Sequence, residues 1–128
     1  MQAFARFFRV LGPIALAAAV GLDAWHAHGL TTSLDADAYA SFGRALDQQY
    51  ILGLALCFAG WRAGSAAGNR AHAIAGVLFV FALLAFCGDV YLGALGYSHP
   101  GIAPQGGSAH ILAWLVFAGA EARAARSN

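Results

Sequence analysis

The sequence predicts an all-α membrane protein built as a single bundle of four transmembrane helices. Of its 128 residues, 60% are hydrophobic and only 10% are charged, whereas soluble domains carry roughly 25% charged residues. A chain of this length could not bury so much apolar surface in a water-soluble core. Four apolar segments, separated by more polar connections, supply the spans of one domain that covers residues 1–128.

The four spans differ in how clearly the sequence marks them. The first follows Arg6 and Arg9 in the manner of a signal peptide, but we expect it to be retained, because no soluble domain follows it. The third is the clearest, since Asp89 is its only charge. The second and fourth are shorter than the roughly 20 residues that cross a bilayer, so tilt or local thinning must cover the difference. The expected spans are residues 7–28, 45–61, 71–97 and 109–122.

The polar connection between the first two spans predicts a short amphipathic helix that lies in the membrane interface. We expect it over about residues 34–44, with Ser33 as its N-cap. Its apolar face would be formed by Leu34, Ala38, Phe42 and Leu46.

Arginine distribution predicts the orientation of the bundle. With four spans, both termini lie on one side, together with six of the seven arginines, and only Arg44 lies opposite. Because cytoplasmic loops are enriched in basic residues, we expect both termini in the cytoplasm of a bacterium, with the bundle in the inner membrane. The connections 29–44 and 98–108 then face outward. A net charge of +1 gives no indication of a nucleic-acid partner.

Three short motifs resemble those of a known family in order and spacing. Residues 24–30, Ala-Trp-His-Ala-His-Gly-Leu, are similar to its Gly-Ala-Phe-Gly-Ala-His-x-Leu stretch, and residues 86–91, Phe-Cys-Gly-Asp-Val-Tyr, to its Phe-Ser-Gly-Ser-x-Tyr. Residues 104–107, Pro-Gln-Gly-Gly, with the later Trp114, resemble its Thr-Pro-x-Gly-Gly loop and the Trp that follows. The family is that of the YgdD-like small inner-membrane proteins. The resemblance implies a four-helix membrane bundle with both termini inside, but no activity.

The chain departs from the family pattern at its polar positions. His28 matches a histidine of the family, whereas Gln49 and Gly53 stand where the family usually has Tyr and His. Small or apolar residues are usual in the family at the four positions Asp23, His26, Asp89 and His110. These substitutions imply an altered polar interior, which weakens the transfer of any role from ordinary members.

The same four residues are the candidate site. Ionisable groups within a membrane are costly and therefore mark functional positions, and the predicted topology places all four in the outward half of the bundle. Two imidazoles with one or two carboxylates suit Cu, Zn or Fe. The predicted metal ligands are His26, Asp89 and His110, with Asp23 as a further ligand or as a group that orients one. His28 and His99 are reserve ligands.

Two other interpretations of these residues remain open. Asp23 and Asp89 would serve as titrating groups in a relay for protons or a small solute. Alternatively, Asp–His contacts only hold the helices together. Haem is not expected, because His26 and His110 both lie near the outer boundary. His72, at the cytoplasmic start of the third span, is expected to be interfacial or solvated.

Enzymatic activity is not favoured by the sequence, although it is left open. No nucleophile–base pair, phosphate-binding loop or metalloprotease motif is present, and the lack of Lys excludes a Schiff-base chromophore. Cys57 and Cys87 are expected to be buried free thiols. The small extramembrane mass and the Ala- and Gly-rich helices instead predict an accessory or assembly subunit of a larger membrane complex. Its partners would be the lipid bilayer and other membrane subunits or further copies of the chain.

Overall fold

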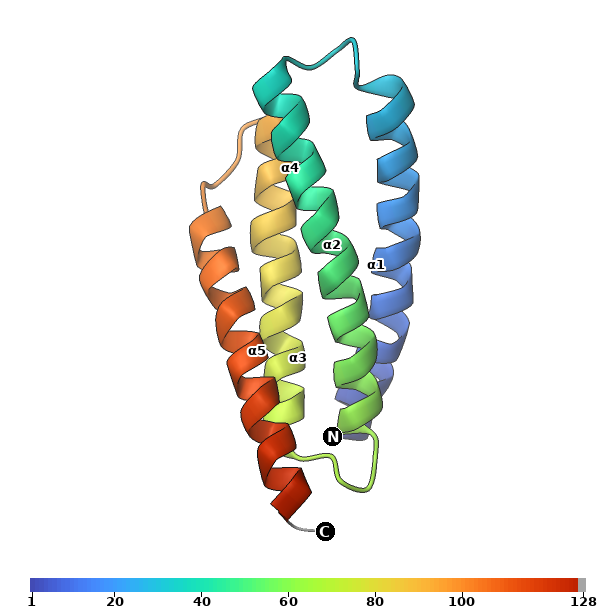
Figure 1. Ribbon diagram of the computed structural model, residues 1–128, viewed down its shortest axis with the longest axis vertical. Coiled ribbons are helices and arrows are strands. Elements are labelled where there is room, and N and C mark those ends of the chain that lie inside the picture. The colour runs from blue at the N-terminus through green and yellow to red at the C-terminus, as the bar shows by residue number, and fades with distance from the viewer. Residues whose placement is uncertain (127–128) are drawn as a thin grey trace.

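The computed structural model describes residues 1–126, which form four long helical runs and no strand (Figure 1). The all-α fold class is therefore confirmed. The third run is interrupted by a π-helical segment, η1. In chain order the elements are α1 (Gln2–Gly29), α2 (Ala36–Ala63), α3 (Arg70–Ala82), η1 (Leu83–Gly88), α4 (Asp89–Ala94) and α5 (Ala103–Arg126).

The runs alternate in direction, so that both termini lie at the same end of the bundle (Figure 1). α1 packs chiefly against α2, α2 also packs against α3, and α5 packs against α3 and η1. Neighbours along the chain are therefore neighbours in space. Short connections favour this arrangement, because they can join only the adjacent ends of antiparallel helices.

Two of the four runs, α1 and the continuous segment Arg70–Ala94, are long and apolar enough to cross a membrane. Large apolar side chains are also exposed on all four runs, among them Val10, Leu54, Leu84 and Leu115. Soluble monomers rarely present such extensive apolar surface. For α2 and α5, the crossing of a membrane remains a prediction.

The separate interfacial helix predicted over residues 34–44 is not formed, because residues 36–44 are the first turns of α2, which continues without a break. Phe42 and Leu46, which were expected on the interfacial helix, share a buried face with Leu52 and Leu56 further along α2. One uninterrupted apolar face therefore favours one long helix over two short ones.

The N-cap of α2 also differs from the prediction. Asp35 caps the helix, and its side chain accepts a hydrogen bond from the backbone N–H of Ala38 at 2.8 Å. Ser33, the predicted cap, instead donates from its hydroxyl to the carbonyl of Gly29 at 3.1 Å. Ser33 thus belongs to the end of α1 and Asp35 to the beginning of α2.

The third run contains a π-helical turn within the predicted span 71–97. A π turn closes hydrogen bonds over five residues rather than four, so it changes the direction in which the following side chains point. Asp89 is the first residue after η1 and is buried, with 4% of its surface exposed. The π turn therefore bears directly on where this carboxylate points.

The same run ends earlier than predicted, at Ala94 rather than Tyr97. Gly96 has a φ of 77°, and the N–H of Tyr97 bonds the carbonyl of Leu92 at 2.9 Å. This is the hydrogen-bond pattern that closes many helices with glycine in the left-handed region. The chain leaves the helix at this point and turns back toward Asp89.

Gly106 allows α5 to lie against η1. A Cβ atom at Gly106 would lie 2.4 Å from the backbone nitrogen of Phe86. We expect Gly106→Ala to lower the free energy of unfolding by about 1.5 kcal/mol, because a backbone atom cannot rotate out of the way. Gly119→Ala is the matched control on the same helix, since no atom lies within 4 Å of its Cβ position. Alanine there should be neutral or stabilise the helix by up to about 1 kcal/mol.

Circular dichroism of the two variants during unfolding in mixed detergent micelles measures both effects. Equal destabilisation by the two substitutions would contradict the close approach of α5 and η1 at Gly106.

Candidate functional site

Asp89 is a buried carboxylate that accepts three hydrogen bonds. Its Oδ1 atom accepts from Nδ1 of His99 at 3.0 Å and from the backbone N–H of Gly101 at 2.9 Å. Its Oδ2 atom accepts from the backbone N–H of Ala103 at 3.0 Å. The first contact requires the imidazole proton on Nδ1. Asp89 therefore ties the α4–α5 connection and the first residue of α5 to the third run.

The position of Asp89 suits a negative charge. Ala103 is the first residue of α5, and the unpaired N–H groups and dipole of a helix N-terminus favour an anion. His99, predicted only as a reserve ligand, is the side chain that contacts Asp89. With three donors at 2.9–3.0 Å, the carboxylate is satisfied by the protein itself.

A cavity of about 390 Å³ opens beside Asp89 and His99. Its rim is formed by the beginning of α2, which contributes Asp35 and Asp37, and by residues of α4 and α5. The Asp35 side chain is used as the cap of α2. The rim is acidic, yet two of its three carboxylates already have donors within the fold.

Asp23 and His26, expected to act together, have different partners. Asp23 accepts a hydrogen bond from the Tyr50 hydroxyl at 3.3 Å. Nε2 of His26 lies 2.9 Å from the Tyr39 carbonyl, to which it donates. The His26 ring stacks on Tyr39 with 3.8 Å between ring centroids and also lies parallel to Phe42. His26 thus joins the end of α1 to the beginning of α2.

His110 is occupied within its own helix. Its Nε2 atom accepts a hydrogen bond from Nε1 of Trp114 at 3.0 Å, so the lone pair needed by a metal is already used. His28 is exposed near the end of α1. Among residues 1–126, no group of three or more His, Cys, Asp or Glu side chains is placed to hold a metal ion. The structure brings Asp89 together with His99, but not with His26, His110 or Asp23.

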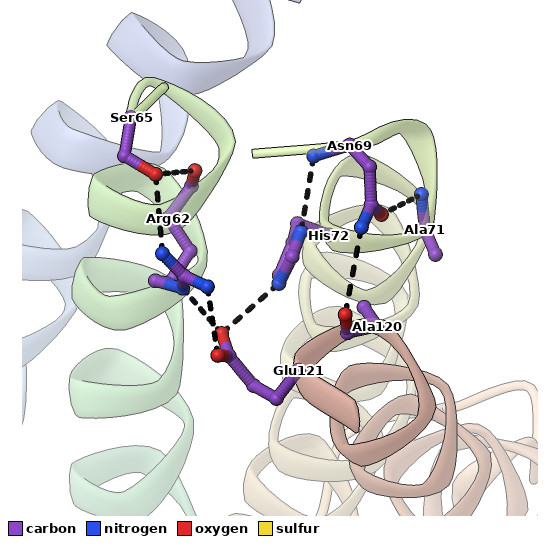
Figure 2. A network of polar contacts seen from close by, with 7 residues as sticks. All are labelled: Arg62, Ser65, Asn69, Ala71, His72, Ala120 and Glu121. Atoms are coloured by element: carbon purple, nitrogen blue, oxygen red, sulfur yellow. Dashed lines mark hydrogen bonds and ion pairs between the residues drawn. The ribbon is translucent and has the colours of Figure 1, made fainter. Parts of the chain in front are cut away.

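A second polar cluster lies at the end of the bundle that holds both termini, where α2 ends and α3 begins. Figure 2 shows this cluster from close by, and none of the predicted site residues belongs to it. Glu121 reaches from α5 toward Arg62 of α2 and His72 of α3. Arg62 pairs with both carboxylate oxygens, through Nε to Oε1 and through Nη2 to Oε2 at 2.8 Å. Nε2 of His72 donates to Oε1 at 3.0 Å. One carboxylate therefore links three of the four helical runs.

His72 is fully buried, so the expectation of a solvated side chain was wrong. Its Nδ1 atom accepts the backbone N–H of Asn69 at 3.2 Å, which leaves the proton on Nε2 for Glu121. The side chain of Asn69 accepts the N–H of Ala71 and donates to the carbonyl of Ala120. The cap of α3 and the Glu121 contact thus form one continuous network.

Arg62 and Glu121 stabilise each other's charged form. The hydrogen bonds that Arg62 donates to Glu121 raise the pKa of Arg62 above its usual value, so the guanidinium stays charged. The side chain of Arg62 is 15% exposed and that of Glu121 is 39% exposed. One feature of the sequence could have identified the cluster: Glu121 is the single acidic residue on the arginine-rich side of the predicted bundle.

A third set of contacts lies inside the bundle. The Tyr91 hydroxyl donates to Oε1 of Gln49 at 2.7 Å, and Nε2 of Gln49 donates to the Ala15 carbonyl at 2.9 Å. Cys57 and Cys87 are free thiols, and Cys87 is buried. Across residues 1–126, every buried side-chain nitrogen or oxygen has a hydrogen-bond partner. The interior polar groups therefore satisfy one another.

Comparison with known proteins gives one match. The model of a family described as "Protein of unknown function (DUF423)" matches residues 22–107. The matched segment includes Asp23, His26 and Asp89, and it ends before His110 and Glu121. No curated protein and no solved structure matches the chain. Because the matched segment covers more than half of the sequence, the chain belongs to the DUF423 family of proteins of unknown function.

Proposed function

We propose that this chain is an integral protein of the bacterial inner membrane and acts as a non-enzymatic accessory or assembly subunit of a membrane complex. One observation carries the proposal. The interior polar side chains hold the helices together, whereas all four runs expose large apolar side chains on the surface of the bundle. We therefore expect the protein to act through contacts of this apolar surface.

The lengths of the helical runs support insertion of the whole bundle. α2 has 28 residues and α5 has 24, and both exceed the roughly 20 residues that cross a bilayer. α2 exposes Leu54 and Phe58, and α5 exposes Leu112 and Leu115. Because these helices lie beside the two more apolar runs, we infer that all four cross the membrane together.

Arginine positions support an orientation with both termini in the cytoplasm. The end of the bundle that holds both termini also holds Arg62 and Arg70, next to the connection between α2 and α3. Arg44 lies toward the other end of α2. This asymmetry agrees with the positive-inside rule and with the orientation that the resemblance to YgdD-like proteins implies.

Small residues on the outer surface support a role in helix–helix contacts. Ala17 and Gly21 are exposed on α1 at a spacing of four, and a Cβ at Gly21 would meet no atom within 4 Å. Ala118 and Ala122 are exposed on α5 at the same spacing. Small residues four apart allow transmembrane helices to approach closely. Another membrane subunit would find suitable faces on α1 and α5.

Cysteine labelling tests the proposed arrangement in the membrane. In a Cys57→Ala, Cys87→Ala background, Ser33→Cys and Ser98→Cys should react with an impermeant maleimide in intact spheroplasts. Ala66→Cys, in the connection between α2 and α3, should react only after permeabilisation. Labelling of Ala66→Cys alone in intact spheroplasts would contradict the orientation, and release of the chain by alkaline carbonate would contradict membrane insertion.

The same background tests the subunit role. Gly21→Cys, treated in native membranes with a short bifunctional maleimide, should give one discrete product of higher mass than the chain. Ala59→Cys is the buried control and should give none, because Ala59 is fully buried. A chain that yields only monomer from native membranes would contradict the subunit proposal.

A further inference from the structure

A groove lies between the first turns of α1 and the first half of α3. Its volume is about 540 Å³, and ligand pockets in proteins commonly hold roughly 300–1,000 Å³. Six of the seven lining residues are apolar. The groove is lined by Met1, Phe4, Arg70, Ala73, Ile74, Val77 and Leu78.

The packing of α1 explains why the groove is open. α1 contacts α3 where the Phe8 ring lies on Gly76, since a Cβ at Gly76 would lie 2.3 Å from that ring. One turn earlier on α1, Phe4 is 48% exposed, and the small side chain of Ala73 faces it from α3. Phe8 therefore joins the two helices, while Phe4 and Ala73 leave space beside it.

Polarity changes along the groove. Arg70 is the first residue of α3 and lies at the arginine-rich end of the bundle. Val77 is seven residues further on, roughly 10 Å along the helix axis at 1.5 Å per residue. The groove thus offers a cation at the proposed membrane surface and apolar walls toward the membrane interior. A phospholipid has the same order of groups, with a phosphate at the surface and acyl chains below it.

Charge favours an anionic occupant. Among residues 1–126, no acidic residue lines the groove and Arg70 takes part in no ion pair. Glu121, the acidic residue at this end, is already paired with Arg62 and His72. A guanidinium can donate two parallel hydrogen bonds to a phosphate. Arg70 is therefore available to a phosphate from outside the chain.

We propose that this groove binds one anionic phospholipid, with an acyl chain along Phe4, Ile74 and Val77 and its phosphate on Arg70. The site rests on the proposed membrane insertion. The order of groups along the groove, a cation at one end and apolar walls beyond it, favours a lipid over a helix from a partner.

Native mass spectrometry of the full chain tests the site. The chain is reconstituted in nanodiscs that contain equal parts of phosphatidylglycerol and phosphatidylethanolamine with identical acyl chains. One phosphatidylglycerol should remain bound in preference to phosphatidylethanolamine. Arg70→Gln should lower this preference by about fivefold, and Arg70→Lys should keep most of it. Arg123→Gln, which removes an exposed charge on α5 outside the groove, is the matched control and should leave the preference unchanged.

A second variant tests the apolar part of the groove. Val77 is 47% exposed, so Val77→Trp should be tolerated by the fold, occupy the groove and reduce retention of both lipids. Circular dichroism and elution volume check that each variant is folded. The proposal is overturned if the wild-type chain shows no preference for phosphatidylglycerol, or if Arg123→Gln loses as much of that preference as Arg70→Gln. It is also overturned if Val77→Trp retains as much lipid as wild type, or if a second copy of the chain is bound in place of lipid.

Carbonate extraction separates the two proposals. A chain that stays in the membrane but shows no lipid preference overturns only the lipid site. A chain released by carbonate overturns membrane insertion and, with it, the lipid site.

Discussion

Replacement of Asp89 by alanine is expected to lower the free energy of unfolding by about 3 kcal/mol. The carboxylate is buried and accepts from His99, Gly101 and Ala103. Each buried donor left without an acceptor costs about 1–3 kcal/mol. The total should be smaller than three times this value, because the exposed α4–α5 connection can turn its donors toward water. Hydrogen exchange at the Gly101 and Ala103 amides should accelerate together with the loss of global stability.

Three further variants separate this effect from a general loss of charge. Asp89→Asn keeps one acceptor oxygen but turns an N–H₂ group toward backbone donors. Its free energy of unfolding should therefore lie between those of wild type and Asp89→Ala. His99→Ala removes only one donor, with a side chain that is 41% exposed, and should cost about 1 kcal/mol. Asp47→Ala removes an exposed carboxylate of α2 and should stay within about 0.5 kcal/mol of wild type. Unchanged exchange at Gly101 and Ala103 in Asp89→Ala would contradict the anchoring role.

Asp89 also illustrates what the sequence could and could not predict. A lone carboxylate in the most apolar segment stands out by composition, so the residue itself could be found. Two of its three partners are backbone N–H groups, one in the α4–α5 connection and one at the first residue of α5, and backbone groups carry no signal in the sequence. The π-helical turn before Asp89 also has no sequence signature. The sequence therefore singled out Asp89, whereas its hydrogen-bond partners His99, Gly101 and Ala103 emerge only from the structure.

The helical runs were easier to predict than their ends. The apolar segments fixed the position of α1, predicted over residues 7–28 and observed over Gln2–Gly29. The fourth run begins at Ala103 rather than near residue 109, because Pro104, Gly106 and Gly107 were interpreted as a loop. Proline is well accommodated in the first turn of a helix, and the lack of a side chain at Gly106 lets α5 pack closely against the backbone of Phe86. Local propensity was overridden here by packing between helices.

The cluster around Glu121 was missed for a different reason. Sequence patterns draw attention to the polar residues of the outward half, because the family usually has small or apolar residues there. The arginines of the other end indicate orientation, and that pattern does not show that one of them pairs with an acidic residue of another helix. The complementary signs of Arg62 and Glu121 could have been noticed, but their separation of 59 residues hides the contact until the topology of α2 and α5 is known.

Removal of the Glu121 carboxylate is the second change with a large expected effect. Glu121→Ala should lower the free energy of unfolding by about 2–3 kcal/mol, because it leaves the fully buried His72 without an acceptor and Arg62 without its counter-ion. This loss is smaller than the loss expected on breaking a fully buried ion pair, because 39% of the Glu121 side chain is exposed. Water can therefore partly replace the missing carboxylate. Unfolding in mixed detergent micelles, followed by circular dichroism, measures the loss.

A double-mutant cycle isolates the ion pair from the rest of the cluster. Arg62→Met and Glu121→Met each leave one charged partner behind, whereas the double variant removes both. The two single effects should therefore sum to more than the effect of the double variant, with a coupling of about 1–2 kcal/mol. Arg123→Met is the control on the same helix, because it removes an exposed cation, and it should be nearly neutral. Additive single effects would show that Arg62 and Glu121 stabilise the bundle independently, in which case the carboxylate does not join α2 to α5.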